Sequence, residues 1–502
     1  MRKYVVFVVF AIISLLYLYS INGIEYAEPD TGYYLVLAKS LSIENGYRLI
    51  SHPANPFEKQ VLPVYPIILV PVFWFANGSY SVARLITVLF AIATLPIIYF
   101  ISRRFFDERV AIYATIIMAL SPMFMIYSRK ILTDVPYLFF FLTFMALTYQ
   151  HQNSNDRRYF IYSLFFLIPL LFTRIVGIVV LTVMLLYSIG KKQSREAVIF
   201  GALVLLFVVY LIYTHNYYSN PTIDLNEFGP EGGILSLDFF RILLERFIGY
   251  FFYYVPLNLF PLFNLLVYLY PMSISFSLPL LSLNNLLLVS GCLISIVMSY
   301  GLYTTAKKNI TLFEIITIVY LVSIIIEHRV TGNGRLLLPV LLFFIIYFIS
   351  GLRSIKILNQ KVASMLLYEI ILLLIIVSAL GFSITLSVVN HKSKNPDSTE
   401  NYITLAKWIQ ENTNESDIVI SDRPFYMYLY SDRKSIDFSE YSLEAIKRSN
   451  ITCGMYIVLG GYYSPDANLA YKDILKSNRN RFRERYSLDD HYSVYEVLRD
   501  VY

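Results

Sequence analysis

Runs of hydrophobic residues, separated by short polar or basic segments, dominate the chain from its first residues to about residue 389. A helix needs roughly 20 consecutive apolar residues to cross a bilayer. The pattern therefore predicts a polytopic α-helical membrane protein with about 11 transmembrane helices. We expect these spans at residues 4–21, 80–102, 110–127, 135–149, 159–173, 175–189, 197–214, 284–304, 310–326, 335–350 and 363–389.

Two further hydrophobic stretches contain several prolines, which break helices. Residues 61–76 favour a helix that lies in or dips into the membrane interface. Within residues 215–283, counting 247–270 as one full span would put Lys307 and Lys308 outside, against the positive-inside rule. A re-entrant, interfacial or doubly crossing segment removes this conflict, and the number of spans in 215–304 stays open.

The pattern changes after residue 394, where charged residues become frequent. Residues 399–412 and 442–449 have helical patterns. Residues 417–421 and 453–459 are typical of short buried strands, and 492–497 alternate like a half-buried strand. We therefore expect a transmembrane domain at 1–394 and a small soluble α/β domain at 395–502.

Basic clusters give the orientation, because Lys and Arg concentrate in cytoplasmic loops. Arg2 and Lys3 precede the first span, and Arg103-Arg104 and Lys191-Lys192 follow later inward spans. The expected protein is a multi-pass protein of the plasma membrane with a cytoplasmic N-terminus. Its external parts are loop one at 23–79, the large loop at 215–283 and the C-terminal domain.

The composition agrees with a membrane protein and excludes an ordinary soluble one. Hydrophobic residues make up 57% of the chain and charged residues 15%, against about 45–50% and about 25% in soluble domains. Loop lysines and arginines account for the net charge of +6, so nothing indicates a nucleic-acid partner. Cys292 lies in an apolar segment and Cys453 in the soluble part, so we expect no disulfide.

The segment Glu28-Pro29-Asp30-Thr31-Gly32-Tyr33-Tyr34 follows directly after the first span. Pro29 and Asp30 are typical of the start of a helix. A carboxylate here is either an N-terminal cap on a surface helix or, held at the lipid–water boundary, a general base or metal ligand. The local sequence leaves both alternatives open.

Two other charged sets fall on the same predicted face. Asp134 follows Arg129-Lys130 at the mouth of a span, and Glu327-His328-Arg329 precedes Arg335 in a late outer turn. Each set alone is more often structural, with side chains reaching to lipid headgroups. Together they suit an anionic, lipid-linked substrate. A phosphate leaving group needs cations but no general acid, whereas an acceptor hydroxyl needs a base.

The order of short motifs resembles that of GT-C glycosyltransferases of the protein O-mannosyltransferase and aminoarabinose-transferase type. The resemblance covers residues 1–140 and 325–340, and only the ordered set is specific. The motifs are Asp30…Tyr33-Tyr34…Ala38-Lys39-Ser40-Leu41, Pro63-Val64-Tyr65-Pro66, Ala83-Arg84, Ser121-Pro122, Thr133-Asp134-Val135-Pro136 and Arg335-Leu336-Leu337-Leu338-Pro339.

The resemblance implies that Asp30 is the first-loop acid, acting as general base or as an acceptor-binding and metal-linked group. Relatives often carry Asp-Glu, whereas this chain has Asp30-Thr31 with Glu28 on the other side. The cofactor is therefore open, and any divalent metal would be bound by Asp30 and Glu28. Lys59 is the implied donor-phosphate ligand, with His52 as a neighbouring alternative.

The remaining implied site residues come from later motifs. Arg335 would face the donor phosphate, with Arg329 as a second ligand and His328 as a helper. Asp134 would support loop one, and it also suits an N-terminal cap on the following helix. The supporting residues also include two from the other motifs, Tyr65 and Arg84.

The sequence thus predicts an inverting glycosyltransferase. It would move a mannose-like sugar, or another hexose or pentose, from a polyprenyl or dolichyl phosphate to a protein, lipid or glycan acceptor. The alternative is a membrane transporter or lipid flippase, which would carry mid-span charges, inverted repeats and paired broken helices. A third possibility is a non-catalytic scaffold that presents residues 395–502. Unlike the mid-span charges expected of a transporter, the charged residues of this chain cluster at the ends of the predicted spans.

Overall fold

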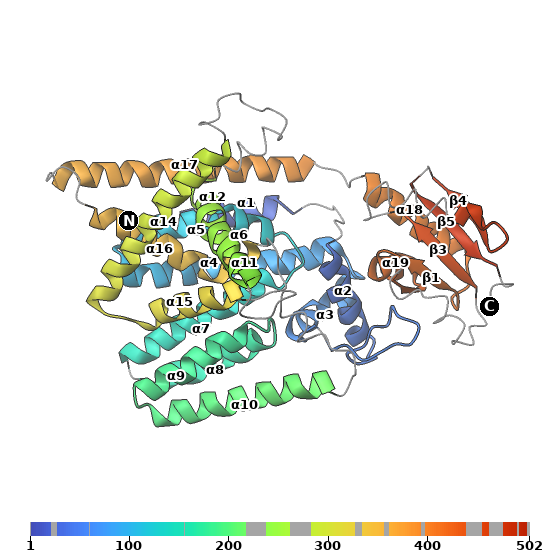
Figure 1. The fold of residues 1–502 in the computed structure, drawn as a ribbon, viewed down its shortest axis with the longest axis horizontal. Helices are drawn as coiled ribbons and strands as arrows, with labels where there is room; N and C mark the ends of the chain where they lie inside the picture. The colour runs from blue at the N-terminus through green and yellow to red at the C-terminus, as the bar shows by residue number, and fades with distance from the viewer. Residues whose placement is uncertain are drawn as a thin grey trace. The chain divides into compact units, whose positions relative to one another are not determined.

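A computed structural model divides the chain into two compact units (Figure 1). The helical unit comprises Met1–Ile21 and Arg84–His391, and the α/β unit comprises Asn22–Ala83 and Lys392–Tyr502. The structure describes residues 2–21, 28–59, 61–154, 156–216, 237–261, 283–326, 334–355, 361–392, 397–437, 454–460, 475–488 and 491–498.

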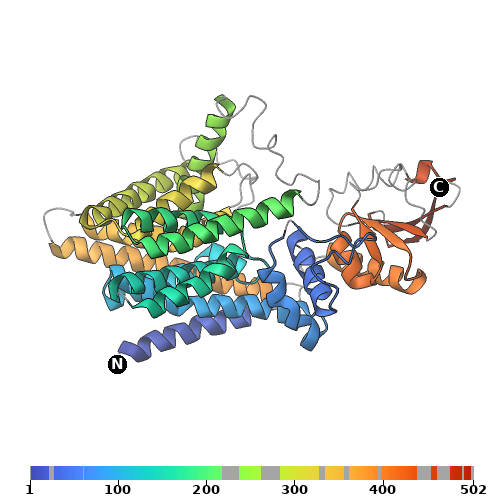
Figure 2. The ribbon, with the colours of Figure 1, turned by 90° about the horizontal axis from the view of Figure 1, so that it is seen from below.

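The helical unit consists of helices that run largely side by side (Figure 2). In chain order they are α1 (Arg2–Tyr19), α4 (Tyr80–Phe105), α5 (Glu108–Ala119), α6 (Pro122–Tyr127), α7 (Asp134–Ser154), α8 (Arg157–Leu171), α9 (Gly177–Gly190), α10 (Ser194–Asn216), α11 (Leu237–Ile248), a π-helix (Gly249–Tyr254), α12 (Val255–Leu259), α14 (Leu283–Lys308), α15 (Leu312–Ile326), a 3-10 helix (Gly334–Leu337), α16 (Leu338–Ser354) and α17 (Lys361–Lys392).

Helix α16 is the core of this unit, since its side chains from Leu338 to Ile349 are all buried. Its close contact with α14 depends on two glycines. A Cβ atom on Gly301 would lie 1.8 Å from the Tyr347 carbonyl oxygen, and one on Gly351 would lie 2.0 Å from that of Val297. The backbones of α14 and α16 therefore meet where neither has a side chain, as is common in membrane helices.

Five described helices are long and apolar enough to cross a membrane by length and composition: Tyr80–Phe105, Ser194–Thr214, Leu288–Lys308, Gly334–Ser354 and Leu366–Val389. The mostly helical, membrane-type architecture is thus confirmed, whereas the expected total of spans stays a prediction. The stretch expected as one span at 110–127 is not one continuous helix. Helix α5 ends at Ala119 and α6 begins at Pro122, a residue that is well suited to the first turn of a helix.

The α/β unit contains a five-stranded mixed sheet in the order β2-β1-β3-β5-β4. Strand β1 is parallel to β2 and β3, while β5 is antiparallel to β3 and β4. One core cluster includes Ile420, Met455, Ile457 and Tyr495. The strands are β1 (Ile418–Ser421), β2 (Lys434–Ile436), β3 (Met455–Leu459), β4 (Phe482–Ser487) and β5 (Ser493–Val497).

The helices of this unit are α2 (Pro29–Ser42), α3 (Val64–Ala76), α18 (Asp397–Asn412) and α19 (Pro424–Ser431). The strands expected at 417–421, 453–459 and 492–497 coincide with β1, β3 and β5, and the helix expected at 399–412 with α18. The sequence did not indicate β2, β4 or α19. The helix expected at 442–449 lies outside the described residues, as does most of the large loop at 215–283.

Candidate functional site

Asp30 lies in the first turn of α2, with Pro29 at the start of the helix and Glu28 at the cap position. The Glu28 side chain makes no capping hydrogen bond. Asp30 itself is half-buried and is not the cap residue. A carboxylate in this turn is stabilised by the positive end of the helix dipole. The alternative of an N-terminal cap therefore does not describe Asp30.

Helix α19 holds this turn of α2 in place. The Tyr426 hydroxyl donates a hydrogen bond to the Glu28 carbonyl oxygen at 2.7 Å. The Tyr33 ring stacks on Phe425 at 4.5 Å with an interplanar angle of 9°. Burial raises the pKa of the Tyr426 hydroxyl, so the hydroxyl stays protonated and able to donate even in alkaline solution. Residues far apart in sequence thus fix the backbone on both sides of Asp30.

The segment that carries Lys59 is tied to the same helix. The Tyr33 hydroxyl donates a hydrogen bond to Glu58 Oε2, and the Val61 amide donates one to Glu58 Oε1 at 3.0 Å. Glu58 is only 7% exposed. Residues three apart in a helix share a face, so Tyr33 lies one turn beyond Asp30. This contact links the Lys59 segment to the turn that follows Asp30.

Sequence reasoning missed Glu58. An isolated acid in an irregular loop has no periodicity, and its only signal was its position beside Lys59. Two predicted neighbours have mainly structural contacts. His52 Nδ1 accepts a hydrogen bond from the Ala54 amide at 3.1 Å. Tyr65 is fully buried in α3, with its ring edge-on to Tyr34 at 5.1 Å.

In the helical unit, Asp134 is the first residue of α7 and is 4% exposed. Its Oδ1 atom forms an ion pair with Arg174 Nη1 at 2.5 Å. Arg174 lies between α8 and α9, so the pair joins α7 to that connection. The sequence did not indicate this pairing, because nothing local relates residues that lie 40 positions apart.

The other predicted residues of this unit have different degrees of burial. Arg84 is buried in α4, and Arg335 is half-buried in the 3-10 helix before α16. His328 and Arg329 lie outside the described residues. Among the residues that the structure describes, no group of three or more His, Cys, Asp or Glu side chains could hold a metal ion. Glu28 and Asp30 remain the predicted ligands of any metal.

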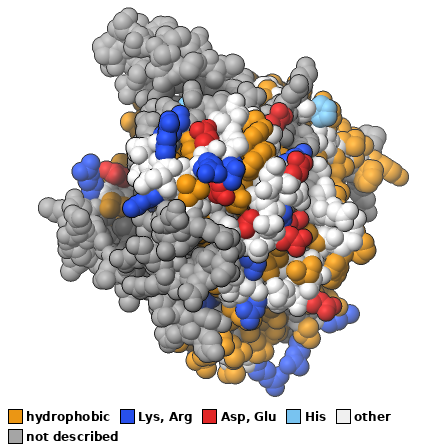
Figure 3. All heavy atoms as spheres, turned by 90° about the vertical axis from the view of Figure 1, so that its right-hand side faces the viewer, with side chains coloured by type: hydrophobic (Ala, Val, Ile, Leu, Met, Phe, Trp, Pro, Cys, Tyr) orange, Lys and Arg blue, Asp and Glu red, His pale blue; other side chains and the backbone are white. Residues whose placement is uncertain are grey.

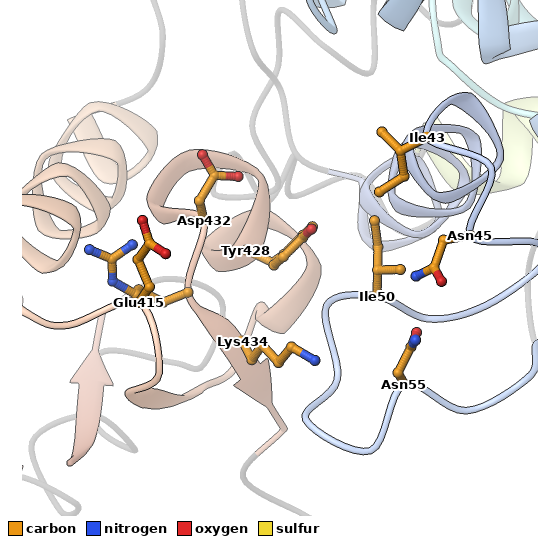
Figure 4. A pocket seen from close by; sticks show the side chains of 9 residues that line it. Ile43, Asn45, Ile50, Asn55, Glu415, Tyr428, Asp432 and Lys434 are labelled. Carbon is orange, nitrogen blue, oxygen red and sulfur yellow. The ribbon is translucent and has the colours of Figure 1, made fainter. Parts of the chain in front are cut away.

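A cavity of about 490 Å³ lies within the α/β unit (Figure 4). Because a helix rises about 1.5 Å per residue, its Ile43 wall is roughly 20 Å along α2 from Asp30. The cavity is therefore separate from the candidate acid. The cavity is lined by Ile43, Asn45, Ile50, Asn55, Glu415, Tyr428, Asp432, Arg433 and Lys434.

Figure 3 shows one face of the molecule, on which acidic and basic side chains are intermixed.

Comparisons with known proteins agree with this architecture. Residues 52–218 match the family described as dolichyl-phosphate-mannose-protein mannosyltransferase. Among curated protein sequences, none matches the chain. The structure is similar to that of ArnT from Cupriavidus metallidurans bound to undecaprenyl phosphate, with a TM-score of 0.59, 14% identity and coverage of 98% of both chains.

A second similar structure is the Archaeoglobus fulgidus oligosaccharyltransferase in its apo form. Its TM-score is 0.57 at 14% identity, over 91% of this chain and 69% of the other. At such low identity these two likenesses establish a shared fold. The family match over residues 52–218 and the shared fold agree with the GT-C resemblance that the ordered motifs indicated.

Proposed function

We propose that the protein is an inverting glycosyltransferase that uses a polyprenyl-phosphate-linked sugar, with Asp30 as its general base. The main supporting observation is the position of Asp30 in the first turn of α2. The hydrogen bond between Tyr33 and Glu58 links this part of α2 to the segment that carries Lys59. The family match at residues 52–218 supports the same class of reaction.

In the proposed reaction, the acceptor hydroxyl gives its proton to the Asp30 carboxylate while its oxygen attacks the anomeric carbon. The bond from that carbon to the phosphate oxygen breaks, and the polyprenyl phosphate leaves with the bonding electrons. A single in-line displacement of this kind inverts the anomeric centre. The phosphate needs no proton to leave but needs cations, and we assign this role to Lys59 and Arg335, with Arg329 as a second arginine.

The finer assignments follow from the motifs and the charge pattern. The transferred sugar is a hexose or pentose, and mannose is the first to test because of the family match. The acceptor is a protein, lipid or glycan at the external face of the plasma membrane, opposite the cytoplasmic N-terminus. The predicted supporting residues are Asp134, His52, Tyr65, Arg84 and His328.

The test compares purified wild-type protein with Asp30→Asn in vesicles that contain radiolabelled polyprenyl-phosphate sugars. Loss of a general base lowers a rate by about 10²–10⁴-fold, so we expect at least a hundredfold lower transfer with unchanged thermal unfolding. The control is Glu44→Gln, which removes an exposed carboxylate just beyond α2. Full transfer activity of a folded Asp30→Asn variant would contradict the assignment of Asp30 as general base. If the wild-type protein turned over none of the lipid-linked sugars, the assignment as a glycosyltransferase of this class would be contradicted.

A further inference from the structure

A second cavity, of about 110 Å³, lies within the helical unit. It is lined by residues from the ends of α4, α7 and α9 and from the start of α15. Small-molecule sites are usually about 300–1,000 Å³. This space is therefore suited to one compact group rather than to a sugar or nucleotide.

The chemistry of its wall is cationic. Arg104 and Lys191 line it, each next to an aromatic ring: the Arg104 guanidinium lies 5.2 Å from the Tyr149 ring centre, and Lys191 Nζ 5.7 Å from that of Tyr187. None of the lining residues is acidic. The amides of Gln152 and Asn309 add neutral polar groups. Arginine and lysine beside amide donors favour a phosphate group.

Acidic residues near the cavity already have other partners. Glu314 is almost fully buried, and its Oε2 atom accepts hydrogen bonds from the amide and the hydroxyl of Thr311. Glu196 Oε1 contacts His151 Nε2 at 3.0 Å. Neither carboxylate lines the cavity.

Exposed apolar side chains adjoin the cationic wall. Ile310, which lines the cavity, is 60% exposed. Leu186 and Ile189, which flank Tyr187 and Lys191 on α9, are exposed as well. A free phosphate ion would gain nothing from this surface, whereas a phospholipid would lay its acyl chains along it.

We propose that this cavity binds the phosphodiester headgroup of an anionic membrane lipid, with Arg104 and Lys191 as its cationic ligands. Basic pockets between membrane helices are a known way to recognise such headgroups. The site belongs to the end of the helical unit whose loops carry the basic clusters. None of its lining residues belongs to α2 or to the residues assigned to the proposed transfer.

The experiment measures binding of phosphatidylglycerol to the purified full-length protein in detergent by native mass spectrometry, with phosphatidylcholine and inorganic phosphate as separate arms. The variant is Arg104→Gln/Lys191→Gln. The control is Arg103→Gln/Lys192→Gln, which removes the same charge from neighbouring residues that do not line the cavity. Thermal unfolding without lipid checks that both variants are folded.

We expect wild type to prefer phosphatidylglycerol, the cavity variant to bind it on the order of tenfold more weakly, and the control to bind nearly as wild type. Equal loss in both variants would show a diffuse charge effect and overturn the site. Saturable binding of inorganic phosphate, lost in the cavity variant without any lipid effect, would overturn the lipid assignment.

Discussion

The Tyr33 hydroxyl donates its hydrogen bond to a buried carboxylate oxygen of Glu58 and thereby joins helix α2 to the segment that carries Lys59. The same ring stacks on Phe425 of α19. Tyr33 therefore connects α2 to two other parts of the α/β unit, the Lys59 segment and α19. If Lys59 binds the donor phosphate, its position depends on this tyrosine.

Replacing Tyr33 by phenylalanine keeps the stacked ring and removes only the hydroxyl. A buried carboxylate that loses a donor costs about 1–3 kcal/mol. We expect Tyr33→Phe to lower the free energy of unfolding by that amount and to raise the KM for the lipid-linked sugar more than it lowers kcat. Tyr428→Phe is the control, because Tyr428 belongs to α19 and its ring lies beside Lys39, near the C-terminal end of α2. Identical effects of both variants on KM would show that Lys59 does not depend on Tyr33.

Gly32 allows α2 and α19 to approach closely. A Cβ atom at this position would lie 3.0 Å both from Phe425 Cβ and from Tyr426 Cε2. Valine would therefore overpack the contact, which typically costs about 1–3 kcal/mol. We expect Gly32→Val to lower the thermal unfolding temperature of the protein and, by displacing Asp30, its transfer rate.

The matched control is Gly381→Val in α17, where a Cβ atom meets nothing within 4 Å. There the substitution only replaces a poor helix former by a better one. Its unfolding temperature should be equal to or slightly above that of wild type. If Gly32→Val behaves in the same way, the contact between α2 and α19 is not tight.

The ion pair between the buried Asp134 and the partly buried Arg174 predicts a strong effect of substitution in the helical unit. Removing one partner of a buried pair leaves an uncompensated charge and costs about 3–5 kcal/mol. We expect Arg174→Met to be much less stable in detergent than Asp134→Leu/Arg174→Met, which removes both charges. Arg158→Met breaks the exposed pair with Asp156 and should change nothing measurable. A double variant no more stable than the single one would refute this account.

Much of the fold was predictable because the bilayer imposes a simple rule on helix length and composition. The stretches expected at 80–102, 197–214, 335–350 and 363–389 all lie within helices apolar enough to span a membrane. The break between α5 and α6 was missed although Ser121-Pro122 marks it, since hydropathy alone does not register a proline. Strands β2 and β4 were missed because one is very short and the other is rich in exposed charge.

The candidate site was predictable only in its local parts. Proline followed by aspartate is a common pattern in the first turn of a helix, so Pro29 and Asp30 indicate where α2 begins. The partners that hold that start in place come from α19, close to the other end of the chain, and no local pattern specifies which distant aromatic residues will meet. The same holds for the pairing of Asp134 with Arg174 and of Tyr33 with Glu58.

Tyr426 makes the stability of the α/β unit depend on pH in the alkaline range. Burial raises the pKa of its hydroxyl, while a tyrosine in the unfolded chain ionises near its ordinary value of about 10. Above that pH the unfolded state releases a proton that the folded state retains, so stability is fully present below pH 10 and falls as the pH rises. Tyr426→Phe should therefore show a shallower loss of stability between about pH 10 and pH 11.

The same variant should be less stable at neutral pH, because it loses the hydrogen bond to the Glu28 carbonyl oxygen. Denaturant unfolding at a series of pH values measures both effects, and Tyr4→Phe, whose ring is exposed, is the control. A slope for Tyr426→Phe equal to that of wild type would mean that this hydroxyl ionises as readily in the folded protein as in the unfolded chain. The close contact that buttresses Asp30 would then be open to water.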